Sequence, residues 1–145
     1  MASEDVGMAY PSAISIVTAC VQASLMVGLP EAVINLSQAV ILMAAAPKSN
    51  TANAAYEAAM ADIRHKKIDD VPDHLKDSHY KGAADLGYGK GYKYPHAYGG
   101  YVEQQYLPDN LYKEGVKYYH PTENGSEKAF KKYLEGLEKD KKAYE

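Results

Sequence analysis

Two long uncharged segments dominate the first third of the chain. Residues 6–30 and 32–47 contain no Asp, Glu, Lys or Arg and are separated by the single charge of Glu31. In the first segment, large apolar residues recur at the three- and four-residue spacing of one helix face: Ile14, Val17, Val21 and Leu25. This spacing predicts a helix. A helix without charged positions is usually buried in a bundle or against a partner subunit.

Proline and glycine divide the first 66 residues into three predicted helices. Pro11 suits a first helical turn, and Gly28 followed by Pro30 suits the end of one helix and the start of the next. The very short link between these two helices predicts an antiparallel hairpin. An alanine-rich third helix is expected to follow, with Ser49 or Asn50 as its cap.

The rest of the chain changes in character. Residues 67–125 are rich in Gly, Pro and Tyr, which predicts short helices, a long irregular strap at residues 87–108, and one helical turn around 108–112. Residues 126–145 predict a Lys-rich closing helix capped at Ser126. Its apolar stripe consists of Phe130, Tyr133, Leu134 and Leu137. No alternation long enough for a sheet is present. We therefore predict a single all-α domain, a helical bundle that spans residues 1–145.

Composition excludes several classes of protein. The chain has 145 residues, with 16 Lys and Arg against 19 Asp and Glu, so its overall charge does not indicate a nucleic-acid binder. Its one cysteine, Cys20, lies among apolar residues, which indicates a buried thiol and a reducing compartment. The acidic start MASEDVG is not typical of a signal peptide. Ser, Thr and Gln dilute the uncharged segments, so we expect no membrane contact and a cytoplasmic protein.

No pattern predicts a catalytic, cofactor or metal site. The sequence GYGKG at 87–91 lacks the spacing and the Ser or Thr of a phosphate loop. His74 and His79 are five residues apart, so they do not share a helix face as a pair of metal ligands would. The nearby Asp residues lack the spacing of a calcium loop. We predict no catalytic residue, no cofactor and no metal in this chain.

The tyrosines of residues 80–119 form the main candidate surface. They could stack on bases, anchor a protein interface, or pin the strap to its own domain. Residues 87–108 carry Lys90 and Lys93 against Glu103, a net charge of about +1, which is small for a groove that follows a nucleic-acid strand. We therefore expect the strap to pack its tyrosines onto its own helices and onto a neighbouring subunit.

Two sets of candidate residues follow from these patterns. For a subunit interface or a DNA contact they are Tyr80, Lys81, Lys90, Tyr92, Lys93, Tyr94, His96, Tyr98, Tyr101, Gln104, Gln105 and Tyr106. For helix packing between subunits they are Val17, Val21, Leu25, Val40 and Met43.

Several stretches in a fixed order resemble a known family. They are ASEDVGMAYPSA at 2–13, LSQAVILMAAAPKSN at 36–50, VPDHLKDSHYKGA at 71–83, GYKYPHAYGGYVEQQYLP at 91–108 and KYYHPTENGSEK at 117–128. Together they resemble the C-terminal part of the RarA/MgsA family of AAA+ ATPases, which are similar to clamp-loader subunits and include the Werner-helicase-interacting protein. The sequence departs from the family pattern at Ala97, where an acidic residue is frequent.

The resemblance implies a function that the residues alone do not. The family's Walker motifs and arginine finger, which bind ATP and Mg, lie upstream of this segment. The matching region resembles the helical collar of clamp loaders and is associated with formation of a homotetramer. The parent proteins act with DNA and replication proteins at stalled forks and in recombination and repair, and the resemblance therefore implies a bacterial, nucleoid-associated protein. An oligomerisation domain without enzymatic activity of its own is therefore expected. The alternative is a module that contacts single-stranded DNA through the Tyr- and Lys-rich segment 80–119.

Overall fold

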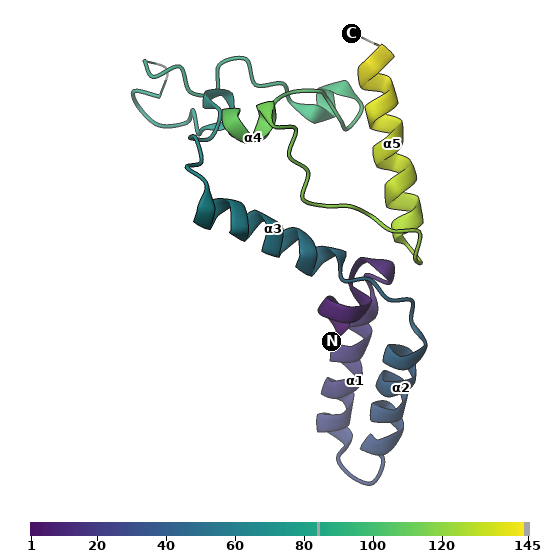
Figure 1. Cartoon of the computed structure of the whole chain (residues 1–145). Helices are drawn as coiled ribbons and strands as arrows, with labels where there is room; N and C mark the ends of the chain where they lie inside the picture. The colour runs from purple at the N-terminus through teal and green to yellow at the C-terminus, as the bar shows by residue number, and fades with distance from the viewer. Residues whose placement is uncertain (84, 144–145) are drawn as a thin grey trace. The chain divides into compact units, whose positions relative to one another are not determined.

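The computed structural model describes residues 1–83 and 85–143, with side chains to residue 139, and every regular element in this part of the chain is helical (Figure 1). The elements are a π-helical turn η1 (Ala2–Val6), the 3-10 turns η2 (Gly7–Ala9), η3 (Asp73–Leu75) and η4 (Pro95–Tyr98), and the α-helices α1 (Ala13–Val27), α2 (Ala32–Ala45), α3 (Thr51–His65), α4 (Asp109–Lys113) and α5 (Glu127–Ala143). The prediction of an all-α fold is confirmed.

The chain divides into two compact units, which differ from the three predicted segments. Unit 1 comprises Met1–Ala59 together with Tyr118–Glu145, so the closing helix α5 belongs with the first helices. Unit 2 comprises Met60–Lys117 and contains the strap. Among the described residues, no helix combines the length and the hydropathy needed to cross a membrane.

The hairpin of α1 and α2 packs through small residues. Gly28 ends α1 with φ of 71°, and its amide donates to the Ser24 carbonyl at 3.0 Å. The Ser24 hydroxyl donates to the Cys20 carbonyl at 2.8 Å, so this buried polar group is satisfied within the helix. The buried residues of the two helices are Ala13, Cys20, Ser24, Ala32 and Ala39. Because these side chains are short, the helices approach closely and the larger apolar side chains are left outside the contact.

Backbone hydrogen bonds to the N-terminal turns connect the other segments of unit 1. The Ser49 amide donates to the Asp5 carbonyl, and the Ser126 amide donates to the Ala9 carbonyl, each at 2.8 Å. At the start of α3, the Ser49 hydroxyl accepts from the Thr51 amide at 3.2 Å, and the Asn50 carbonyl accepts from the Ala54 amide at 2.9 Å. Both residues predicted as the cap of this helix therefore take part in its start.

Gly125 occupies a position that excludes any side chain. Its φ is 52°, and a Cβ atom there would lie 2.1 Å from the carbonyl oxygen of Ala9. We expect Gly125→Ala to lower the free energy of unfolding by about 2–4 kcal/mol, from backbone strain and the displaced chain. The matched control is Gly136→Ala within α5, where a Cβ meets nothing within 4 Å and helix propensity favours alanine by about 1 kcal/mol. Urea unfolding of both variants measures the difference, and equal stabilities would contradict this close approach.

Unit 2 has a small apolar core and many polar links. Its buried apolar side chains are Ala83, Val102 and Leu111. Asn110 donates to the Lys67 carbonyl at 3.0 Å and exchanges backbone-to-side-chain hydrogen bonds of 3.1 Å with Asp69. The Lys76 ammonium binds Asp70 at 2.6 Å and Asp73 at 2.8 Å. Hydrogen bonds and ion pairs between side chains and backbone therefore add to the small apolar core of this unit.

Candidate functional site

Large apolar residues follow the buried positions of the hairpin by one residue. Ile14, Val21 and Leu25 follow the buried Ala13, Cys20 and Ser24 on α1, and Val33 and Val40 follow the buried Ala32 and Ala39 on α2. One residue is a rotation of about 100° around a helix. Because α1 and α2 are antiparallel, the same rotation turns both sets toward the same side of the hairpin. Together with Val17 and Leu36, these residues define what we call the apolar face.

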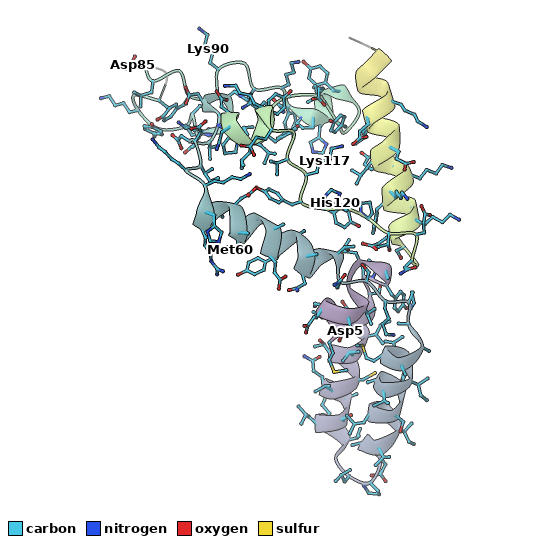
Figure 2. The ribbon with its side chains drawn as sticks, in the orientation of Figure 1. Asp5, Met60, Asp85, Lys90, Lys117 and His120 are labelled. Carbon is cyan, nitrogen blue, oxygen red and sulfur yellow. The ribbon has the colours of Figure 1, made fainter. Side chains whose placement is uncertain are left out.

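The apolar face is uncovered in the single chain. The exposed fractions are 51% for Ile14, 43% for Val21, 81% for Leu25, 53% for Val33, 43% for Leu36 and 66% for Val40. No charged residue lies within α1 or α2. Figure 2 shows the side chains of both helices projecting away from the hairpin. A contiguous surface of this kind marks a contact site rather than an ordinary solvated face.

The structure places the predicted helix-packing residues on or beside this face. Val21, Leu25 and Val40 are exposed, whereas Val17 and Met43 are partly buried toward the helix contact. Val33 and Leu36 were not predicted as interface residues. Their spacing to Val40, of seven and four residues, is the signal that places them on the same helix side.

The strap is ordered through side-chain hydrogen bonds to its backbone. Gln104 accepts from the Lys93 amide at 3.1 Å and donates to the Lys93 carbonyl at 2.9 Å, which closes the loop between them. The Gly100 amide donates to the Pro95 carbonyl at 2.9 Å, and Gly99 adopts the left-handed conformation that ends η4. The prediction of a largely irregular strap is confirmed.

The candidate tyrosines in the strap and just before it are exposed rather than buried against the chain's own helices. The exposed fractions are 47% for Tyr80, 47% for Tyr92, 60% for Tyr94, 56% for Tyr98 and 46% for Tyr106. The part of the expectation that packs the tyrosines onto the chain's own helices is wrong for these residues, and the part that packs them onto a neighbouring subunit stays a prediction. The physical reason is the small core of unit 2, whose buried side chains are too few and too short to hold large rings.

The other candidate residues of the strap divide into two groups. Gln104, Gln105 and Tyr106 serve its internal structure: Gln105 donates to Asp109 at 2.7 Å, and the Tyr106 hydroxyl accepts from Gln104 at 3.0 Å. Lys81, Lys90 and His96 are exposed. The Tyr101 hydroxyl donates to the Glu103 carboxylate at 2.7 Å.

Among the described residues, the most buried charged group is the Glu127 carboxylate, which no sequence pattern predicted. Glu127, at the start of α5, has an exposed fraction of 0%. Its carboxylate accepts from the Thr51 hydroxyl, from the Thr122 hydroxyl at 2.5 Å and amide at 3.2 Å, and from the Tyr119 hydroxyl at 3.1 Å. Burial alone would raise the pKa of Glu127, but the hydrogen bonds from Thr122, Thr51 and Ser49 lower it to about 2. Burial and the bond to Glu127 raise the pKa of Tyr119 to about 12.

This carboxylate joins the starts of two helices. Thr51 opens α3 and Glu127 opens α5, and the two residues are 76 positions apart in the chain. An ionised carboxylate is also favoured at the N-terminus of a helix. The groups around it are hydroxyls and an amide that donate to this carboxylate, so we assign Glu127 a structural role in unit 1.

Comparison with known proteins supports the resemblance. A family model described as the C-terminal region of the MgsA AAA+ ATPase matches residues 1–138. The Replication-associated recombination protein A of Bacillus subtilis is 51% identical over 143 residues, which cover 97% of this chain and 34% of that protein. The protein of the same name from Escherichia coli is 37% identical over 131 residues, or 88% of this chain and 28% of that protein. The ATPase WRNIP1 of Dictyostelium discoideum is 36% identical over 116 residues, which cover 79% of this chain and 13% of that protein.

The helical fold and these matches define the class: the chain is all-helical and matches the C-terminal region of an AAA+ ATPase. Within that class, the chain belongs to the MgsA AAA+ ATPase C-terminal family. The chain spans about a third of the length of these two relatives named Replication-associated recombination protein A. The family membership inferred from the sequence is confirmed.

Proposed function

We propose that this chain is an assembly module that holds copies of a AAA+ ATPase together through the apolar face of the α1–α2 hairpin. The supporting observation is the exposure of six large apolar side chains on one uncharged side of that hairpin. Its relatives are named replication-associated recombination proteins, so we further propose that the assembled protein acts in replication and recombination. ATP and Mg would bind to the ATPase module of the parent protein.

The energies are of the right size for self-association. Fully burying one large aliphatic side chain contributes about 1.5–3 kcal/mol, so covering the exposed half of each of the six contributes about 6 kcal/mol per copy. A symmetric contact uses the face of both copies and doubles this figure. Association costs about 4–15 kcal/mol in lost motion. The gain from the face is therefore comparable to the cost of bringing two copies together, and a homotetramer requires a second contact surface.

Co-purification tests the proposed assembly directly. A tagged copy of the chain is expected to retain an untagged copy on an affinity column after the two are mixed at micromolar concentration. Recovery of the untagged copy in the flow-through at every concentration would contradict the proposal. A tagged unrelated helical protein controls for adsorption.

The glycine-rich segment supports a function without nucleotide chemistry. The Gly89 amide donates to the Asp73 carbonyl at 2.9 Å, the Lys90 amide to the Gly87 carbonyl at 3.3 Å and the Tyr92 amide to the Gly89 carbonyl at 3.2 Å. A phosphate loop needs such amides pointing at the ligand. We therefore expect no heat of binding when Mg-ATP is titrated into this chain in a calorimeter, and micromolar binding would contradict this interpretation.

A further inference from the structure

The strap holds exposed aromatic rings in a fixed arrangement. The Tyr94 and His96 rings lie 5.1 Å apart and are tilted by 53°. The Ala97 amide donates to the Tyr94 carbonyl at 3.0 Å, and the Gln104 bonds to Lys93 close the loop just before these rings. The rings of Tyr94 and Tyr98 nevertheless remain more than half exposed. A short loop therefore presents its aromatic side chains to the outside with little freedom of the backbone, and such an arrangement suits recognition better than core formation.

Two lysines lie beside these rings in the sequence, and the nearest carboxylates on either side are those of Asp85 and Glu103. From Leu86 to Val102 the sequence contains no Asp or Glu, and it contains Lys90 and Lys93. Both lysines are exposed, and Figure 2 shows the Lys90 side chain extending away from the ribbon. Within the described residues, neither lysine forms an ion pair with a carboxylate. Lys93 instead approaches the Glu103 carbonyl oxygen at 3.5 Å.

Flat rings next to unpaired cations fit a partner with flat rings and negative charge. Single-stranded nucleic acid exposes the faces of its bases for stacking and carries one phosphate per nucleotide. A duplex keeps its bases stacked on each other, so these tyrosines could reach only its backbone. The wider unit is neutral, since residues 60–117 carry nine Lys or Arg and nine Asp or Glu. Stacking rather than charge would therefore provide most of the affinity.

We propose that the strap around Tyr94 and Tyr98 is a stacking site for single-stranded nucleic acid. Tyr94, His96 and Tyr98 stack on bases, and Lys90 and Lys93 contact phosphates. The site takes bases without reading their sequence, because a ring face accepts any base. This site is independent of the proposed assembly, since its residues lie in unit 2 and the apolar face lies in unit 1.

Fluorescence anisotropy with a labelled oligomer of about 20 thymidines tests the site in the whole chain. We expect the double variant Tyr94→Ala with Tyr98→Ala to weaken binding by about tenfold per ring removed. The matched control is Tyr56→Ala, which removes a tyrosine of similar exposure, 61%, from α3 and is expected to leave binding unchanged. The Lys90→Gln with Lys93→Gln variant should flatten the salt dependence by a slope of about 1.4 on a double logarithmic plot.

Several outcomes would overturn the proposal. The proposal is wrong if the wild type shows no detectable binding of the thymidine oligomer at low salt. It is also wrong if the double tyrosine variant and the wild type bind the oligomer with equal affinity. A double variant that loses oligomeric mass and melting temperature but keeps its affinity would assign the rings to a subunit contact instead. If the tyrosine variant unfolds, the salt dependence of the lysine variant tests the proposal instead, because its substitutions are on exposed side chains and should leave the fold intact. An unchanged salt dependence would then contradict the proposal. A DNA duplex without single-stranded ends offers no free base faces. If it binds as tightly as the oligomer, and the tyrosine variant loses the same affinity for both, stacking on bases is contradicted.

Discussion

Glu127→Ala is expected to lower the free energy of unfolding of this protein by about 3 kcal/mol. The substitution removes the acceptor shared by Thr51, Thr122 and Tyr119, and it leaves polar groups without partners in a buried position. Each buried group left unsatisfied costs about 1–3 kcal/mol, and part of that cost is recovered when water enters. Chemical unfolding at pH 7, followed by circular dichroism, measures the change.

The same carboxylate makes stability depend on pH. The folded pKa of Glu127 is about 2 against an ordinary value of 4.5. A lowered folded pKa means that the stabilisation is fully present above about pH 4.5 and is lost as the pH falls toward 2. The linkage amounts to about 3 kcal/mol over this range. Glu127→Gln, which cannot ionise, should remove this part of the acid dependence.

Glu123→Gln provides the matched control for Glu127. Glu123 lies four residues earlier, is exposed, and forms a 2.5 Å ion pair with Lys131. Surface pairs of this kind contribute about 1 kcal/mol or less. A Glu127→Gln variant that matched Glu123→Gln in stability at pH 7 and kept the acid transition of the wild type would show that the buried carboxylate is not the structural group described here.

Val40→Asp is expected to separate assembly from folding. Val40 is 66% exposed in the single chain, so an aspartate there remains hydrated and the helical content should be unchanged. In an assembled contact the same aspartate would be buried without a partner, which costs several kcal/mol. Because each 1.4 kcal/mol is a factor of ten, we expect the dissociation constant for self-association to rise at least about a hundredfold. Sedimentation velocity over a concentration series measures it.

Gln38→Asp is the control for this variant on the same helix. Gln38 precedes Val40 by two residues and is also exposed, but it points about 160° away around α2. It should therefore keep the self-association of the wild type. Equal weakening by both substitutions would indicate a general effect of charge on the helix, and no weakening by Val40→Asp would remove the apolar face from the contact.

Local patterns were sufficient to predict the helices. The uncharged segments, the prolines at 11, 30 and 47, and the glycine at 28 correctly predict α1 and α2 to within a few residues. The turn around 108–112 is confirmed as α4. These signals act through neighbouring residues only, so a sequence is enough to interpret them.

Contacts between distant residues were not predictable in the same way. Glu127 stands beside Lys128 in a Lys-rich helix, and that context is typical of a solvated surface. Its burial depends on Thr51, 76 residues earlier, and on Thr122 and Tyr119, which follow no recognisable spacing. The exposure of the strap tyrosines likewise depends on how little core unit 2 provides, a property of the whole unit.

The predicted apolar stripe of the last helix shows the same limit of local patterns. Phe130, Tyr133 and Leu134 lie at helical spacing on α5, yet they are 36%, 60% and 37% exposed. Spacing identifies which residues share a helix side, but it does not determine whether another element covers that side. The same reasoning applies to the apolar face of the hairpin, where the exposed side chains support a partner outside the chain.

Absolute mass in solution tests the central proposal most directly. Light scattering coupled to size exclusion, over concentrations from about 1 to 300 µM, gives the mass without reference to shape. The assembly proposal predicts a mass that rises to a multiple of the 15.9 kDa chain, reaching four copies if the proposed homotetramer forms. A mass that stays at one copy over the whole range, with the helical content intact, would contradict it.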